Sequence, residues 1–294
     1  MFAAALIVFR ESLEASLIIS VMLAATRGIA LRGRWVVAGV LAGLVGSAVV
    51  ASSMEVIASL ASGMGQELFN AAVLMLAIGM LAWHNIWMSV HGREMVAQVS
   101  NAARAVKDGS RNRSLVFIVV ALAVLREGSE TVLFLYGLAS SGEEGLRSTL
   151  LGGFGGLASG ALVGGLLYAG LLRIPLRWFF SITGVLVLLL AASMASQAAR
   201  LLIQADLLPG LATPLWDTSD LLSQSSPLGT LLHGLIGYEA QPAGMQVVSY
   251  VSALLSIAGA MYWVSSRART EAQPPLARHE SNASSTLADL APKT

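Results

Sequence analysis

Two short segments of this sequence place charged residues inside long apolar runs. They are FRESLEASLI (9–18) and LREGSETVLFL (125–135), and both contain the pattern Arg-Glu-x-x-Glu. A charge at the centre of a bilayer costs about 2.5–3.5 kcal/mol on insertion scales, so three charges in one apolar helix need a chemical reason. The charged residues are Arg10, Glu11 and Glu14 in the first copy, and Arg126, Glu127 and Glu130 in the second.

The spacing of the motif predicts a cation site. Positions i and i+4 of a helix lie about 40° apart and positions i and i+3 about 60° apart, so each arginine can pair with the second glutamate while both carboxylates face one side. Each copy keeps one surplus negative charge, and an all-oxygen carboxylate site suits a hard metal ion. The alternative is a buried ion pair that fixes helix register. Two copies with surplus carboxylates favour the metal site, with Glu11, Glu14, Glu127 and Glu130 as ligands and Arg10 and Arg126 orienting them.

The composition is that of a multi-pass membrane protein. Of 294 residues, 55% are hydrophobic and 12% are charged, whereas soluble proteins are about 25% charged. The chain has no cysteine, which excludes disulfides and thiolate metal sites. The net charge is +1 with no basic patch, so we expect membrane lipid rather than nucleic acid as its surroundings.

The apolar runs predict an all-α integral membrane protein with seven transmembrane helices. Residues 1–265 would form one seven-helix transmembrane domain, and residues 266–294 a disordered cytoplasmic tail rich in Ser, Ala, Pro and charge. The predicted spans are 2–26, 35–62, 68–90, 115–140, 148–172, 178–204 and 244–265. Gly-rich stretches such as 152–165 indicate faces where helices pack closely in lipid.

The distribution of positive charge predicts the orientation. Of the 18 lysines and arginines, 14 fall in alternate loops and the tail, all on one side of the predicted spans. The positive-inside rule then gives an outside N-terminus and a cytoplasmic C-terminus. The two motif helices run in opposite directions, so spans one to three and four to six would form an inverted 3+3 repeat followed by a seventh helix. Transporters place substrate sites at the interface of such repeats.

Two motif copies in these positions resemble the oxidase-linked iron permeases, which include fungal high-affinity permeases and a bacterial inner-membrane permease. QELF (66–69) resembles the acidic start of the family's third helix, and residues 216–242 resemble its long outer loop. The resemblance implies an iron permease of the cytoplasmic (inner) membrane, no prosthetic group, and oxidation of ferrous iron by an extracytoplasmic oxidase or iron-binding partner. Assembly as a homo-oligomer stays open. The sequence departs from the family pattern at Ser12, Ser129 and Asn70, the last of which replaces a second outer glutamate.

Several acidic residues are further candidate metal ligands. Glu67 would begin the third span, and Glu55 lies in the outer part of the second. Asp217 and Asp220 in the outer loop either receive metal from a partner or cap a short helix. The rest of the acidic outer surface reads as a solvated face that also concentrates cations; it comprises Glu143, Glu144, Asp206 and Glu239.

Other polar and sulfur-containing residues favour structural roles. We interpret His84 and Asn85, in WHNIWM (83–88), as an interfacial polar cluster, with an exit ligand as the alternative. Met75, Met80 and Met88 recur at loosely helical spacing, which is typical of packing. Tyr238 and Glu239 are expected to anchor the outer loop at the membrane surface.

The competing functions are other cation permeases, a membrane enzyme and a metal sensor. The sequence holds four histidines and no His-Glu-x-x-His pattern, which disfavours an intramembrane metalloprotease. A permease for lead or manganese remains an alternative, although the absence of cysteine disfavours lead. A non-transporting metal sensor is the other alternative. The motif occurs in both halves of the chain, which a transport pathway requires and a sensor does not.

Overall fold

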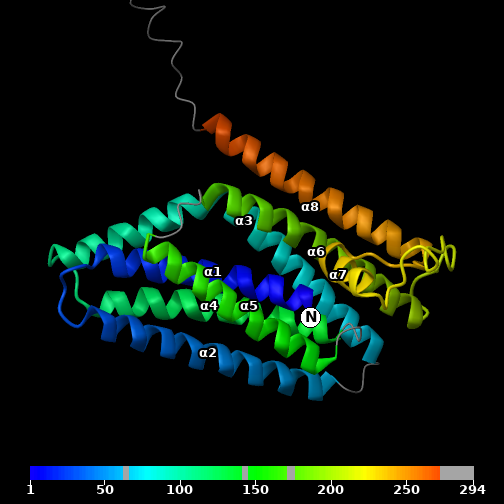
Figure 1. The fold of residues 1–294 in the computed structure, drawn as a ribbon, viewed down its shortest axis with the longest axis horizontal. Helices are drawn as coiled ribbons and strands as arrows, with labels where there is room; N and C mark the ends of the chain where they lie inside the picture. Colours follow the sequence, from blue (N-terminus) through cyan, green and yellow to red (C-terminus); the bar gives the residue numbers. More distant parts are fainter. Residues whose placement is uncertain (62–65, 141–144, 171–175, 272–294) are drawn as a thin grey trace, which may run out of the picture.

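The computed structural model describes residues 1–61, 66–140, 145–170 and 176–271. These residues form eight helices and no strand, arranged as one elongated bundle with α2 and α8 at opposite edges (Figure 1). The helices are α1 (Phe2–Ala25), α2 (Arg32–Ala61), α3 (Gln66–Lys107), α4 (Ser114–Ser140), α5 (Leu146–Tyr168), α6 (Leu176–Gln204), α7 (Pro227–Ile236) and α8 (Gly244–Glu271).

Five helices, α2, α3, α5, α6 and α8, are long and apolar enough to cross a membrane. The motif helices α1 and α4 are of similar length, 24 and 27 residues, but each has three charged residues near its middle. These charges do not face lipid in α1, because Arg10, Glu11 and Glu14 are all buried inside the bundle. Both helices are otherwise apolar, so their charged residues stand out as a candidate site.

The third helix is longer than the sequence predicts. The apolar span of α3 runs over Glu67–Gly92, close to the predicted 68–90, but the following segment is helical as far as Lys107 where the sequence predicts a loop over 91–114. Val99, Ala103 and Val106 recur on one face of this extension and pack with Met22 of α1 and with the start of α4. The last helix also passes its predicted end and reaches Glu271, while residues 272–294 of the predicted tail lie outside the described residues.

The helices pair in a reciprocal pattern. The most extensive packing joins α1 to α5, α2 to α4 and α3 to α6. The start of α1 packs with the end of α4, through Ile7 and Phe134, and its end packs with the start of α4, through Met22 and Val116, so these two helices are antiparallel. This is the pairing that an inverted relationship between α1–α3 and α4–α6 would produce.

Each motif helix is held by a glycine-bearing helix that runs parallel to it. On α5, Gly152, Gly156, Gly160 and Gly164 follow each other at intervals of four and face successive turns of α1. On α2, Gly39 and Gly43 face α4 in the same way, and a Cβ at Gly43 would lie 2.6 Å from the Cβ of Val124. Small residues let helix backbones approach closely in lipid, and here they fix the two motif helices.

The α1–α5 contact gives a direct test of this packing. Gly156→Ala places a Cβ against the carbonyl oxygen of Ala5, whereas a Cβ at the adjacent Gly155 meets nothing within 4 Å. We expect Gly156→Ala to destabilise the protein by about 1–3 kcal/mol through overpacking. Gly155→Ala should leave stability unchanged or raise it, since alanine favours a helix over glycine. Thermal unfolding in detergent distinguishes the two, and equal midpoints would contradict the close approach.

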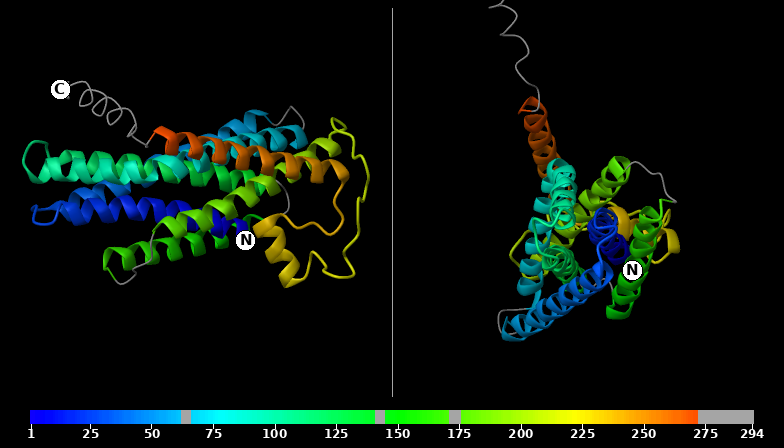
Figure 2. Two further views of the ribbon diagram at one scale, coloured as in Figure 1. Left: turned by 90° about the horizontal axis from the view of Figure 1, so that it is seen from above. Right: turned by 90° about the vertical axis from the view of Figure 1, so that its left-hand side faces the viewer.

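The long connection before α8 gathers at the end of the bundle where α1 begins (Figure 2). It contains α7, which starts at the Ser226 cap and stops at Gly237 in the left-handed conformation. Two backbone hydrogen bonds join distant parts of this connection. The N–H of Leu215 donates to the oxygen of Pro242 at 2.8 Å, and the N–H of Thr218 donates to the oxygen of Ala240 at 2.9 Å. Because α7 contacts α1 and α6, this connection covers that end of the bundle.

Candidate metal centre

The two motifs meet at one buried cluster in the middle of the bundle. Glu11, Glu127 and Glu130 and the imidazole of His84 each offer one ligand atom, and these atoms all lie within 4.8 Å of one another. Glu11 and Glu127 are 1% and 2% exposed, so their carboxylates are removed from solvent. Helices α1, α3 and α4 thus contribute side chains that are far apart in the sequence.

Both arginines form the i,i+4 pairs that the motif spacing predicts. Arg10 Nε lies 3.2 Å from Glu14 Oε1, and Arg126 Nε lies 3.2 Å from Glu130 Oε1. The first glutamate of each copy is more distant, with Arg10 Nη1 3.8 Å from Glu11 Oε1 and Arg126 Nε 3.9 Å from the corresponding oxygen of Glu127. Each arginine therefore engages one carboxylate closely and leaves the other largely unpaired.

The cluster holds an excess of buried acceptor atoms. Both carboxylate oxygens of Glu11 and of Glu127 are buried without a hydrogen-bond partner. Such atoms normally find a partner, since an unsatisfied buried polar group costs about 1–3 kcal/mol and more when charged. Four carboxylates face two guanidinium groups here, so the site is chemically suited to a bound cation.

His84 joins the two motifs, and the structure buries it inside the bundle where the sequence predicts an interfacial polar cluster. Its side chain is 3% exposed; its Nε2 lies 3.2 Å from Glu14 Oε2 and its Nδ1 2.5 Å from Glu130 Oε2. The reason is that α3 packs against both motif helices, which places residue 84 between Glu14 of α1 and Glu130 of α4. The sequence does contain a signal, because His84 continues the buried face of α3 that includes Leu74, Ala77 and Leu81.

Asn85 is also buried, but it serves the packing of α3. Its Nδ2 donates to the backbone oxygen of Gly184 on α6 at 3.0 Å and lies 3.6 Å from the sulfur of Met261 on α8. The predicted pair of interfacial residues therefore divides into one residue at the cluster and one that joins three helices.

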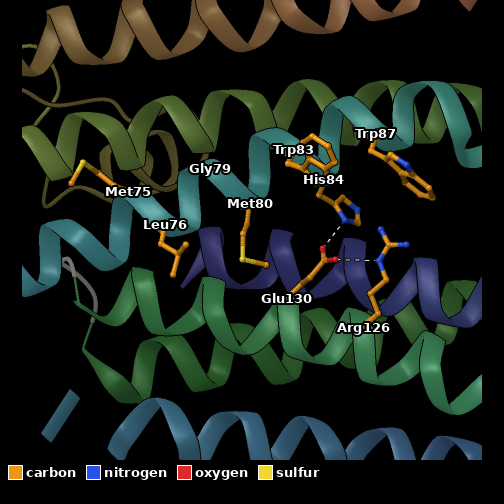
Figure 3. A pocket seen from close by; sticks show the side chains of 9 residues that line it. All are labelled: Met75, Leu76, Gly79, Met80, Trp83, His84, Trp87, Arg126 and Glu130. Carbon is orange, nitrogen blue, oxygen red and sulfur yellow. Dashed lines mark hydrogen bonds and ion pairs between the residues drawn. The ribbon is translucent and has the colours of Figure 1, made fainter. Parts of the chain in front are cut away.

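A cavity of about 510 Å³ between α3 and α4 reaches one side of the cluster (Figure 3). Arg126 and Glu130 open onto it, and the Arg126 guanidinium carbon lies 4.9 Å from the ring centre of Trp87. The side chain of Arg126 is 39% exposed and that of Arg10 only 2%, so the two chemically equivalent motifs differ in access. The remaining lining residues are Met75, Leu76, Gly79, Met80, Trp83 and His84, which gives two of the methionines a place on the cavity wall as well as in packing.

The outer candidate ligands lie apart from this cluster. Glu67 is exposed in the first turn of α3, and Asp217 and Asp220 are exposed in the loop before α7. Asp217 accepts hydrogen bonds from the Ser219 hydroxyl, from the Ser219 backbone N–H at 2.9 Å and from Gln241 Nε2 at 2.8 Å, and these bonds lower the pKa of its carboxyl group. Asp217 therefore stabilises a turn; it does not cap a helix as the second alternative predicts, because the short helix α7 is capped by Ser226. The side chain of Glu55, and Glu143 and Glu144, lie outside the described residues.

Tyr238 and Glu239 fold the outer loop onto itself. The Tyr238 hydroxyl donates to the backbone oxygen of Leu222 at 2.9 Å, and Glu239 accepts from Gln246 Nε2 at 2.8 Å. These contacts hold the loop together and join it to the start of α8, while anchoring at the membrane surface stays a prediction.

Comparison with known proteins decides the family. A model of the iron permease FTR1 family matches residues 1–266, nearly the whole helical part of the chain. The chain belongs to the iron permease FTR1 family. Among curated FTR1-type relatives, the ferrous iron permease EfeU of Escherichia coli O6:H1 is 34% identical over 253 residues, covering 84% of this chain and 90% of that protein. EfeU of Yersinia pestis is 32% identical over 255 residues, covering 85% and 89%. No solved structure matches the chain.

Membership of the FTR1 family confirms the resemblance seen in the motifs. The relatives are named as permeases, in agreement with the prediction that the chain is not an enzyme. The family assignment and the long apolar helices together support iron transport at the inner membrane. The assignment of individual ligands rests on the geometry of the cluster.

Proposed function

We propose that this chain moves iron across the cytoplasmic membrane into the cell, and that the glutamates of both motifs hold the ion during passage. The observation that carries the proposal is the meeting of two Arg-Glu-x-x-Glu segments at one buried cluster with unpaired carboxylate oxygens. Burying surplus negative charge is unfavourable without a compensating cation. A transported cation would neutralise this charge while it is bound. When the site is empty, the arginines offset part of the buried negative charge by pairing with Glu14 and Glu130.

The proposed pathway uses both halves of an inverted repeat. In this arrangement α1–α6 and α8 span the membrane, with the N-terminus outside and α7 in the outer loop. The reciprocal pairing of α1 with α5 and of α2 with α4 supports it, as do the 14 positively charged residues on the opposite side. The cluster then lies where the two halves cross, which is where repeat-built transporters bind substrate.

We propose that the outer end receives iron from an extracytoplasmic partner. Asp206, Asp217 and Asp220 are exposed on the connection that covers this end, beside the exposed Trp216. An acidic surface attracts cations and basic partner surfaces. Ligation by Glu67, Asp217 or Asp220, and oxidation of iron by the partner, stay predictions from the sequence.

Fusions to green fluorescent protein test the orientation, since this reporter fluoresces only when it folds in the cytoplasm. We expect a fusion after Asp108, in the α3–α4 connection, to fluoresce and a fusion after Leu208, beyond α6, to be dark. A fusion after Glu271 should fluoresce like the first. The opposite pattern at comparable protein levels would overturn both the topology and the direction of transport.

Radioactive iron uptake in cells tests the function itself. Cells that express the chain should accumulate iron above an empty-vector control, and unlabelled iron should compete better than manganese or lead. Stronger uptake of labelled manganese than of iron would select the manganese alternative. Expression without uptake of either metal would support the sensor alternative.

A further inference from the structure

His84 is the one part of the cluster that the repeated motif does not supply. It comes from α3, and its ring lies between the two motifs. Its Nε2 is 3.2 Å from Glu14 Oε2 of the first motif, and its Nδ1 is 2.5 Å from Glu130 Oε2 of the second. The ring is buried and lines the cavity that opens onto Glu130 (Figure 3). An all-carboxylate account of the site gives this imidazole no function.

The two ring nitrogens have different surroundings. Nε2 forms a hydrogen bond with Glu14 Oε2, and the other oxygen of Glu14 is in an ion pair with Arg10. Nδ1 lies 2.5 Å from Glu130 Oε2, in an ion pair that is not aligned as a hydrogen bond. Both oxygens of Glu11 and of Glu127 are buried nearby without a hydrogen-bond partner. Nε2 is therefore held by a carboxylate that Arg10 also holds, whereas Nδ1 faces Glu130 and the other carboxylates of the candidate site. Metal-bound histidines are typically held in this way, with a carboxylate on the second ring nitrogen.

We propose that His84 is a ligand of the transported ion through Nδ1, and that Glu14 is a positioning residue that holds its ring. The inference rests on the proposed function and refines it, because the site becomes three carboxylates, from Glu11, Glu127 and Glu130, and one imidazole. Imidazole suits iron and later first-row transition metals, whereas carboxylate and water suit magnesium, calcium and manganese. His84 thus makes the site select transition-metal dications from a solution rich in hard divalent cations.

The charge of the cluster agrees with a divalent occupant. Four carboxylates and two guanidinium groups leave two negative charges when His84 is neutral. A divalent ion brings the buried site to neutrality, and a trivalent ion would leave a buried positive charge. The ferrous ion is therefore the better match to this site.

Equilibrium binding of Co²⁺ and Mn²⁺ to the purified full chain in detergent tests the inference. His84→Gln keeps a side chain of similar size and replaces the nitrogen with a carbonyl oxygen. We expect it to lower Co²⁺ affinity at least about tenfold more than Mn²⁺ affinity. His91→Gln is the matched control, because His91 lies seven residues further along α3 and bonds to the backbone oxygen of Trp87; it should bind both ions like the wild type. Equal loss of both ions in His84→Gln, or no loss of either, would overturn the inference.

Glu14→Gln provides a second route if His84→Gln does not fold. It should lower Co²⁺ affinity about 10- to 100-fold, the usual effect of removing a residue that orients a ligand, and lower Mn²⁺ affinity less. An unchanged ratio of the two affinities in folded Glu14→Gln would contradict the positioning role. The proposed function is tested by a different measurement, iron transport. Normal iron transport by Glu11→Gln or Glu127→Gln would refute the proposed function, whatever ion the His84 variant prefers in the binding experiment.

Discussion

Glu11→Gln and Glu127→Gln are each expected to reduce iron uptake by cells at least about tenfold while leaving the protein inserted. Glutamine keeps the shape and one carbonyl oxygen of the side chain but loses the negative charge that holds a cation. A hydrogen bond or contact to a charged group is worth about 1.5–3 kcal/mol, which corresponds to about 10- to 100-fold in binding. Both carboxylates are buried with unpaired oxygens, so no other partner replaces the lost charge. Uptake of labelled iron, normalised to membrane protein level, measures the effect.

The same variants separate a metal site from a purely structural ion pair. If the motifs only fixed helix register, neutralising Glu11 or Glu127 would remove surplus charge and leave uptake intact or raise stability. Glu94→Gln is the matched control, since Glu94 is exposed on the α3 extension, and it should transport iron normally. Near-normal uptake in either cluster variant would refute a role for both halves in handling the ion.

Arg10→Lys is expected to abolish uptake and lower thermal stability, whereas Arg126→Lys should retain part of both. Arg10 is 2% exposed and lies beside Glu14 and Glu11, so a lysine there would leave buried acceptors unsatisfied, at about 1–3 kcal/mol. A lysine offers a point charge in place of the planar guanidinium that addresses two carboxylates. At position 126 the side chain is 39% exposed and opens onto the cavity, where lysine can be solvated.

Uptake and unfolding temperature of the two lysine variants measure this asymmetry. The wild-type chain and Arg104→Lys, an exposed arginine near the end of α3, serve as references. Equal losses at positions 10 and 126 would contradict the difference in access between the two motifs. Normal transport by Arg10→Lys would show that the arginine does not orient its glutamates.

The motif could be predicted from the sequence because its geometry is local. The spacing between Arg10 and Glu14 alone implies their pairing, and the pairing of Arg126 with Glu130 follows in the same way. Opposite directions of the two helices follow from the number of spans between them. The Gly-rich stretch of α5 was also predictable as a packing face, although not its partner α1, because helix pairing depends on contacts between distant segments.

The surroundings of His84 could not be predicted, because they depend on contacts between distant segments. The apolar span of α3 ends at Gly92, close to the predicted residue 90, but the packing of α3 against α1 and α4 buries His84 between Glu14 and Glu130. The unequal exposure of Arg10 and Arg126 could not be predicted either, since both copies have the same pattern. It arises from the cavity between α3 and α4, which only the packed bundle reveals.

Flux of labelled iron into liposomes that contain only the purified chain tests the central claim most directly. The account predicts time-dependent entry of iron with the wild-type chain and entry no faster than in empty liposomes with Glu127→Gln. We expect this entry when iron is supplied on the side to which the N-terminus is exposed. Two results would contradict the claim that this chain conducts iron through its paired Arg-Glu-x-x-Glu helices. One is iron entry with the wild-type chain at the rate of empty liposomes, and the other is iron entry with Glu127→Gln at the wild-type rate.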